Sequence, residues 1–186
     1  METVPLIYVR NECVLDNKTG EETKNWEPLI ERLKQLYVID VDGLLENKPC
    51  LELYQRMCEY VSLWVDSGPR VFEDVMDIVV AGAEKITVQR KLFKDDSSQL
   101  FDAMEREIYS GLELQDVVNG LWNEDSKWTG VVVYVHTEIG FKEKDYLGTV
   151  AKKTPLYLVA REQGFIDREW GEDVGVKGII YPVGEE

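Results

Sequence analysis

Residues 61–88 read VSLWVDSGPRVFEDVMDIVVAGAEKITV, and this stretch contains two short apolar runs separated by an amphipathic segment. Val61–Val65 and Lys85–Val88 are rich in apolar and β-branched residues with little alternation, which is typical of parallel strands covered on both faces. Phe72–Ala81 has a helical period and is followed by Gly82, a residue that commonly ends helices. The stretch therefore predicts a strand, a helix and a second strand. The expected apolar face of the helix consists of Phe72, Val75, Met76, Val79 and Val80.

Six more apolar runs of the same kind occur on either side of this unit, at Pro5–Val9, Leu36–Val41, Ile108–Leu112, Val131–Val135, Leu156–Val159 and Gly178–Tyr181. Helical patterns lie between several of them, over residues 26–35, 51–59 and 96–106. Alternation of strands and helices predicts a parallel α/β architecture with right-handed crossovers. Eight strands suit either a closed (β/α)₈ barrel or an open doubly wound sheet, and periodicity alone does not choose between them.

The last third of the chain differs from the rest. Residues 140–154 and 161–174, which connect the last three predicted strands, are rich in Lys, Glu, Asp and Gly and lack a long apolar stripe. The chain has 186 residues, whereas barrels of this kind usually need about 250. If the sheet closes, the chain is a single α/β domain over residues 1–186, a compact (β/α)₈ TIM barrel with several outer helices shortened or missing in the C-terminal third.

Missing helices would leave strands uncovered. Three apolar strands without an outer layer would expose a patch larger than soluble monomers usually tolerate. A second copy of the chain is the commonest way to cover such a patch, so we expect a homodimer.

The charge of the chain excludes two classes of partner. With 21 Lys and Arg against 36 Asp and Glu, the net charge is −15, which repels nucleic-acid phosphates and anionic membranes. No apolar stretch approaches a membrane span, and the first residues, METVPLIYVRNE, lack a signal-peptide pattern. Three cysteines without a CxxC motif favour reduced thiols. We expect a soluble cytoplasmic protein with no bound metal and no cofactor.

Three segments carry a resemblance to a known family. They are Tyr37–Pro49 (YVIDVDGLLENKP), Val65–Val75 (VDSGPRVFEDV) and Tyr134–Ile139 (YVHTEI). In order and in strand position they resemble the ribotide isomerase of histidine biosynthesis, the ProFAR isomerase family, whose stretches read roughly V-D-L-D-G, G-G-G-I-R-x-x-E-D-V and T-x-I. The resemblance covers residues 4 to about 139 and is loose beyond. It implies a (β/α)₈ barrel that binds a small molecule at the carboxyl ends of its strands.

The family catalyses an Amadori rearrangement of an aminoaldose ribotide with two carboxylates, one acid and one base. The resemblance places Tyr8 at the first of these positions, Glu113 at the second, and Thr137 at the threonine of strand six. These three are the candidate catalytic residues. An unperturbed tyrosine is a poor base near neutral pH, so we expect the usual rearrangement to be lost.

The family's two glycine-rich phosphate sites are altered too. Gly68 and Arg70 match the motif of strand three, but Asp66 and Ser67 replace the glycines before them. Side chains could hold an anion in place of the lost backbone sites. The candidate ligand-binding residues are Asp42, Gly68, Arg70, Arg90 and Arg161, with Lys91 as a further cation.

Two interpretations stay open at the residue level. Asp40 and Asp42, two apart in a strand, would face the same way and join Asp66 and Glu113 in an acidic mouth for a hard cation or a polyhydroxy ligand. The alternative is that a strand-end carboxylate caps the following helix. His136 is expected to pack or to support another residue rather than to catalyse, because on a strand it points away from Thr137.

The leading hypothesis is a diverged relative of the ribotide isomerase that binds a phosphorylated or sugar-like small molecule at the barrel mouth. One alternative is a non-catalytic regulatory or interaction protein that retains the fold. Another is an active isomerase with a site of Tyr8, Glu113 and Thr137.

Overall fold

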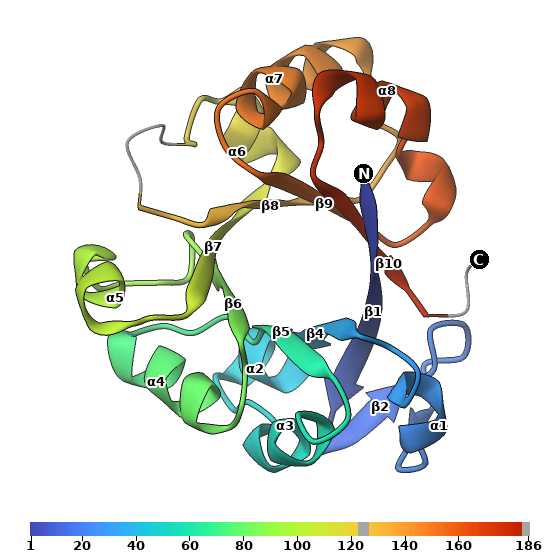
Figure 1. The fold of residues 1–186 in the computed structure, drawn as a ribbon, viewed down its shortest axis with the longest axis vertical. Coiled ribbons are helices and arrows are strands. Elements are labelled where there is room, and N and C mark those ends of the chain that lie inside the picture. Colours follow the sequence, from blue (N-terminus) through green and yellow to red (C-terminus); the bar gives the residue numbers. More distant parts are fainter. Residues whose placement is uncertain (123–126, 184–186) are drawn as a thin grey trace.

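The computed structural model describes residues 1–122 and 127–183, and its eight parallel strands form a closed barrel (Figure 1). Pairing of the last strand with the first closes the sheet, with Glu2 opposite Gly178 and Leu6 opposite Pro182. All eight predicted strands are confirmed, and the barrel, not the open sheet, is the observed fold. The strands are β1 (Glu2–Arg10), β4 (Gln35–Asp40), β5 (Ser62–Asp66), β6 (Lys85–Gln89), β7 (Glu107–Glu113), β8 (Gly130–Val135), β9 (Leu156–Ala160) and β10 (Gly178–Pro182).

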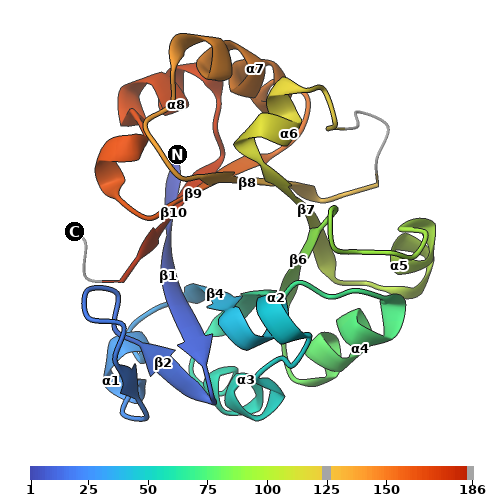
Figure 2. The ribbon, with the colours of Figure 1, turned by 180° about the vertical axis from the view of Figure 1, so that it is seen from behind.

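Helices lie outside most of the barrel, with α7 and α8 on one side and α3 and α4 on the opposite side, as Figures 1 and 2 show. The helices predicted after the second, third and fourth strands are present, although Val80 is 75% exposed and does not belong to the buried face of its helix. The first helical pattern gives only one short helix, because the next strand begins at Gln35. The elements are α1 (Glu27–Ile30), α2 (Val41–Glu46), α3 (Leu51–Met57), α4 (Phe72–Val80), α5 (Ser98–Ala103), α6 (Leu114–Val118), α7 (Phe141–Ala151), η1 (Gln163–Phe165) and α8 (Arg168–Val174).

The C-terminal third has shortened helices, as expected, and each connection between its strands contains a helix. Helix α7 has 11 residues, whereas α6 has 5 and α8 has 7. Few apolar side chains suffice to anchor α7, because Leu147 and Val150 are completely buried and Gly148 lets Val174 of α8 approach. Every residue of β8, β9 and β10 is buried within the single chain. The argument for a dimer from uncovered strands therefore fails, and the oligomeric state stays a prediction.

A small hairpin that the sequence pattern did not reveal extends β1. Strand β2 (Cys13–Leu15) runs antiparallel to β1, and β3 (Glu22–Thr23) pairs with β2. The turn from β1 to β2 has both of its central residues in the left-handed region, Asn11 at φ 52° and Glu12 at φ 55°, as two-residue hairpin turns of type I′ require. The loop between β2 and β3 thereby reaches the carboxyl end of the barrel.

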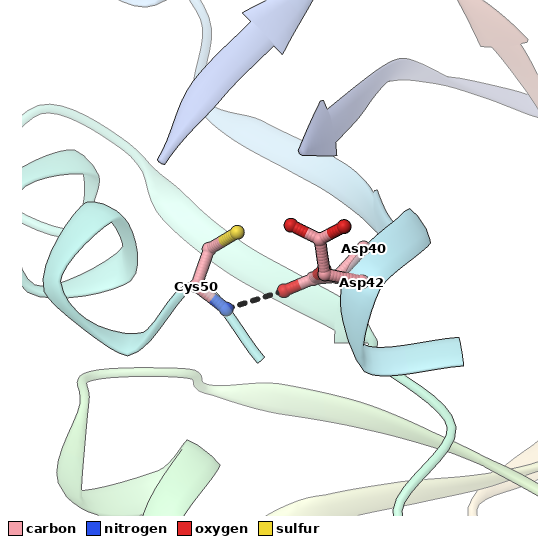
Figure 3. A group of neighbouring side chains, drawn as sticks. All are labelled: Asp40, Asp42 and Cys50. Atoms are coloured by element: carbon pink, nitrogen blue, oxygen red, sulfur yellow. Dashed lines mark hydrogen bonds between the residues drawn. The ribbon is translucent and has the colours of Figure 1, made fainter. Parts of the chain in front are cut away.

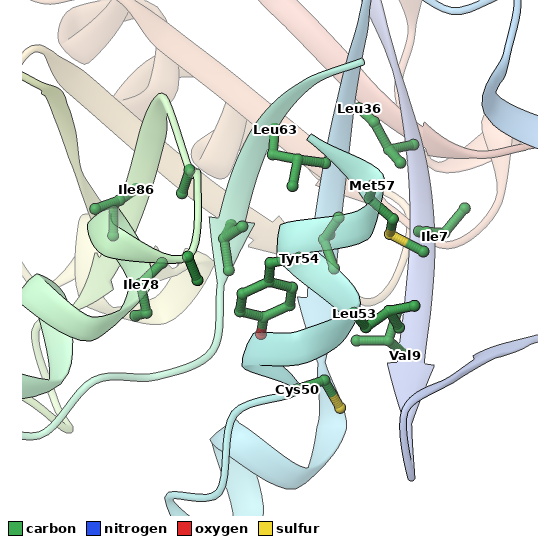
Figure 4. Packing of buried hydrophobic residues seen from close by; sticks show 14 of the residues in the cluster. Ile7, Val9, Leu36, Cys50, Leu53, Tyr54, Met57, Leu63, Ile78 and Ile86 are labelled. Carbon is green, nitrogen blue, oxygen red and sulfur yellow. The ribbon is translucent and has the colours of Figure 1, made fainter. Parts of the chain in front are cut away.

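Apolar side chains form two layers, one outside the strands and one in the barrel interior. The outer layer packs the strands against the helices, and Figure 4 shows its part beneath α3 and α4. The interior contains a cluster of aromatic rings: between centroids, the ring of Trp64 lies 5.1 Å from that of Tyr37, 4.2 Å from that of Tyr109 and 4.8 Å from that of Tyr157. Large rings fill the space within the strands. No helix in residues 1–122 and 127–183 is long and apolar enough to cross a membrane.

The outer layer can be tested with two leucines on neighbouring helices. Leu53 of α3 is completely buried, whereas Leu45 of α2 is 76% exposed. Leu53→Ala should lower the free energy of unfolding by about 3 to 5 kcal/mol, because it removes buried methyl groups and leaves a cavity. Leu45→Ala should change it by less than about 0.5 kcal/mol. Urea unfolding of both variants measures the difference, and equal effects would show that α3 does not pack on the strands as described.

Candidate ligand-binding site

A cavity of about 810 Å³ opens at the carboxyl ends of the strands. Side chains from the ends of β1, β6, β7, β8 and β9 line it, and the loop between β2 and β3 contributes one side. Its walls combine apolar residues, including Ile39, Leu44 and Val159, with several charged groups. The position agrees with the expectation that a ligand binds at this end of the barrel.

The charge of the cavity lining is opposite in sign to that of the whole chain. Four cationic side chains line the cavity, against two carboxylates, which gives 4 − 2 = +2 where the chain carries −15. Lys18 and Arg161 have no ion-pair partner among the described residues, and their charges are available to a ligand. The four cations are Arg10, Lys18, Lys91 and Arg161, and the two acids are Asp16 and Glu113.

Lys91, Glu113 and His136 form a connected group on one wall. Lys91 Nζ donates to Glu113 Oε1 at 2.6 Å, and His136 Nε2 lies 2.9 Å from Glu113 Oε2. Partial burial tends to raise the pKa of Glu113, but the hydrogen bonds from Lys91 and His136 outweigh burial and lower it. Glu113 is therefore held as a carboxylate near neutral pH.

A second carboxyl group, Asp66, lies beneath the floor of the cavity and is completely buried. It accepts hydrogen bonds from the hydroxyl of Tyr134, from Gln89 Nε2 at 2.9 Å and from the backbone N–H of Gly68 at 3.2 Å. Burial outweighs these hydrogen bonds and raises the pKa of Asp66 to about 6. Tyr134 and Gln89 themselves line the cavity, so they separate Asp66 from a bound molecule.

Hydroxyl groups continue this network into the barrel interior. Tyr37 Oη donates to Thr87 Oγ1 at 3.0 Å and lies 3.1 Å from Tyr134 Oη. Trp64 Nε1 donates to the same threonine oxygen at 2.9 Å. Burial raises the pKa of both Tyr37 and Tyr134 well above the usual tyrosine value, which keeps their hydroxyls protonated. Each polar side-chain group of Tyr37, Trp64, Thr87 and Tyr134 therefore has a hydrogen-bond partner.

The structure brings four of the predicted site residues to the cavity: Tyr8, Lys91, Glu113 and Arg161. Two others are near the mouth but do not line it. Thr137 is exposed beyond the end of β8, and Arg90 turns outward, where its Nη1 donates to the carbonyl oxygen of Leu121 at 2.7 Å.

Two of the three segments that carry the resemblance, Tyr37–Pro49 and Val65–Val75, contact each other beside the cavity. Gly43 lies so close to Ser67 that a Cβ atom at its position would be 2.6 Å from the Ser67 carbonyl oxygen. Arg70 donates to the carbonyl oxygens of Leu44, at 2.6 Å, and Gly68. These contacts brace α2 against the turn between β5 and α4.

Asp42 has a similar supporting place. Its Oδ2 accepts a hydrogen bond from the backbone N–H of Asn11 at 2.7 Å, and this contact ties α2 to the turn of the hairpin. Asp42, Gly68 and Arg70 are absent from the lining of the cavity.

Asp40 and Asp42 do not share a strand face, because the helix α2 begins at Val41. That interpretation is wrong, and the capping alternative is confirmed: Asp40 Oδ1 accepts from the N–H of Gly43 at 2.9 Å. Figure 3 shows Asp40, Asp42 and Cys50 together, with oxygen and sulfur atoms within 4.8 Å of one another. Asp40 Oδ2 also accepts from Cys50 N at 2.6 Å, and burial raises the pKa of the Cys50 thiol to about 12. These contacts give the group of Asp40, Asp42 and Cys50 a structural role.

Sequence reasoning missed part of the site. His136 was expected to pack or to support another residue, but its side chain is 73% exposed and lines the cavity. Gln89 and Tyr134 were not singled out as ligand contacts. The signal in the sequence was the position of these residues along the strands. Gln89 ends β6, and Tyr134 and His136 lie at the end of β8, where side chains meet at the mouth of the barrel.

Comparison with known proteins supports the fold. No family model matches the chain, and no curated protein matches it either. Among solved structures, phosphoribosyl anthranilate isomerase from Thermococcus kodakaraensis aligns with a TM-score of 0.63 at 17% identity, over 100% of this chain and 90% of that one. The fold is that of a TIM barrel.

Two further structures agree with this assignment. N-(5′-phosphoribosyl)anthranilate isomerase from Pyrococcus furiosus aligns with a TM-score of 0.61 at 16% identity, over 100% of this chain and 90% of that one. The YdjI aldolase from Escherichia coli K12 aligns with a TM-score of 0.62 at 12% identity, over 96% and 74%. The TIM barrel described here therefore shares its architecture with isomerases and aldolases.

The buried carboxyl of Asp66 makes the stability of the TIM barrel depend on pH. Its pKa is about 6 in the folded chain, against 3.8 without the fold, so the folded state binds the proton more tightly. Stability should rise as pH falls through 6, by on the order of 1 kcal/mol between about pH 7.5 and about pH 5. Urea unfolding at both pH values measures the change.

Two variants separate Asp66 from the other carboxylates. Asp66→Asn should lose most of the increase in stability between about pH 7.5 and about pH 5, because the titrating group is absent. Asp77→Asn, at an exposed position of α4, should retain it. An unchanged rise in Asp66→Asn would contradict the assignment of the shift to Asp66.

Proposed function

We propose that this chain binds a small anionic molecule, phosphorylated or sugar-like, in the cavity at the barrel mouth. The observation that carries the proposal is the charge reversal, with four cations around a hollow in a chain of net charge −15. Cations gathered at a partly desolvated surface repel one another, and an anion between them removes that cost. Arg10 and Lys91 are paired with Glu22 and Glu113, whereas Lys18 and Arg161 form no ion pair within 4.0 Å of a carboxylate among the described residues.

The size and composition of the cavity suit such a ligand. Its volume of about 810 Å³ lies within the range of 300 to 1,000 Å³ that is roughly usual for small-molecule sites. The alternative of a non-catalytic interaction protein would be favoured by a mouth closed by Tyr8 and Arg90. Arg90 instead bonds to the carbonyl of Leu121, so the open cavity favours a bound small molecule.

The phosphorylated character of the ligand has two further supports. The sequence resembles the ribotide isomerases of histidine biosynthesis over residues 4 to about 139, and two of the structures with the same fold are named as phosphoribosyl anthranilate isomerases. We infer a diverged relative that no longer performs the usual rearrangement, since Tyr8 occupies the position of one of the two required carboxylates.

Ligand binding can be tested by thermal unfolding with ribose 5-phosphate and with inorganic phosphate. A ligand that binds only the folded chain stabilises it by about 2.7 kcal/mol at a concentration of 100 times its Kd, which raises the Tm by several degrees. Arg161→Ala should weaken binding by roughly 10- to 100-fold, because a charged hydrogen bond contributes about 1.5 to 3 kcal/mol.

Arg90→Ala is the matched control, since it removes an arginine near the mouth that does not line the cavity. It should leave the affinity unchanged. A Tm that responds to neither compound, or an equal loss in both variants, would remove the support for an anion site at Arg161.

The loss of the usual rearrangement has its own test. The chain should not rescue growth of a histidine auxotroph that lacks ProFAR isomerase, and the purified protein should show no such activity. The reason is that Tyr8 stands where the family has one of its two carboxylates. Replacement Tyr8→Asp restores the carboxylate and serves as a comparison. Growth with the unmodified chain would overturn this inference.

A further inference from the structure

On one wall of the cavity, the side chain of Glu113 is hydrogen-bonded to both Lys91 and His136. Lys91 follows β6, Glu113 ends β7 and His136 follows β8, and these strands are neighbours in the sheet. Glu113 accepts from Lys91 through Oε1 and contacts His136 Nε2 through Oε2. All three side chains line the cavity.

The contact with Glu113 determines the tautomer of His136. An ionised carboxylate only accepts hydrogen bonds, so Nε2 carries the hydrogen and Nδ1 of the neutral ring has a lone pair. Within the described part of the chain, no residue forms a hydrogen bond to Nδ1. The side chain of His136 is 73% exposed, so a molecule in the cavity can reach the ring.

The other protic groups near the floor of the cavity are already engaged. Tyr134 Oη donates to Asp66 and lies 3.1 Å from Tyr37 Oη, and Gln89 is bonded to Asp66. His136 is therefore a base at the cavity, and its acceptor nitrogen, Nδ1, forms no hydrogen bond with any of these groups.

We propose that His136 is the catalytic proton-transferring residue of this cavity, that Glu113 is its positioning residue, and that the substrate is a small anion with a C–H bond beside a carbonyl group. The inference rests on the proposed function, because it requires an anion in the same cavity. It differs from the pair of carboxylates that the resemblance implies, since a histidine held by a glutamate replaces them.

The reaction step balances without a cofactor. Nδ1 of His136 takes the proton from carbon, and the electron pair of the broken C–H bond forms a C=C bond while the carbonyl π electrons move to oxygen. The resulting imidazolium lies against the Glu113 carboxylate, which stabilises its charge. Lys91 has three N–H donors and uses one on Glu113, so another can donate to the enolate oxygen. Return of the proton to carbon restores neutral His136.

The tautomer can be observed directly, because the chain contains one histidine. In the ¹⁵N-labelled full chain at a pH where the imidazole is neutral, NMR should show Nε2 protonated and Nδ1 unprotonated. Glu113→Ala should give a mixture of tautomers. Glu138→Ala, at an exposed carboxylate outside the cavity lining, should keep the original pattern. The opposite tautomer in the unmodified chain would overturn the proposal.

Proton transfer can be measured as exchange of carbon-bound hydrogen for deuterium in D₂O. The probes are dihydroxyacetone phosphate, D-ribulose 5-phosphate and pyruvate, with binding followed in parallel by thermal unfolding. We expect exchange above the buffer rate for at least one bound probe. His136→Gln should slow it about 100-fold or more while the probe still raises the Tm. Glu138→Gln should leave both readouts unchanged.

The Tm reports anion binding and the deuterium exchange reports proton transfer by His136, so the two proposals can fail separately. If a probe binds but exchanges no faster than in buffer, or if His136→Gln exchanges as fast as the unmodified chain, the role of His136 is refuted while anion binding stands. If no probe binds, the proposed function fails and this inference fails with it.

Discussion

The pairing of β1 with β10 is the constraint on which the rest of the structure depends. Five residue pairs, from Glu2 with Gly178 to Leu6 with Pro182, join the two ends of the sheet. The junction is tight, since a Cβ atom at Gly178 would lie 2.8 Å from both Glu2 and the ring of Tyr157. Closure pairs the last parallel strand with the first and brings the carboxyl ends of eight strands to one rim. The candidate site exists only because of that rim.

The closed barrel must also be filled, and aromatic side chains fill it. Trp64 packs against Tyr37, Tyr109 and Tyr157, and these rings bring polar atoms into the buried interior. Trp64 Nε1 and the Tyr37 hydroxyl donate to Thr87 Oγ1, which avoids the cost of an unpaired buried group. The hydroxyls of Tyr109 and Tyr157 donate to Glu107 and Glu2. Asp66 is the carboxyl group of this network with a high desolvation cost, and it lies beneath the cavity floor, behind Tyr134 and Gln89.

Charge is distributed unevenly over this framework. The net charge of −15 keeps the outer surface acidic, while the rim collects Arg10, Lys18 and Arg161 around the cavity. The rim has two chemically distinct parts: the ends of β6, β7 and β8 carry Lys91, Glu113 and His136, and β9, β1 and the hairpin loop carry the cations. In the proposed function, a ligand that spans both parts would place its anionic group beside the cations and its reactive group beside His136.

The sequence by itself determined the eight strands and the helices α3, α4 and α5, because apolar runs and helical periodicity are local signals. It did not determine closure, which depends on contacts between the two ends of the chain, or helix α7, whose few buried side chains suffice only against strands already in place. The tertiary structure also decided the site. Arg90 and Lys91 are adjacent, yet one bonds to Leu121 outside the cavity and the other to Glu113 within it. The direction of a side chain where a strand gives way to a loop is set by the local course of the backbone and by its spatial neighbours, and residue type does not encode it.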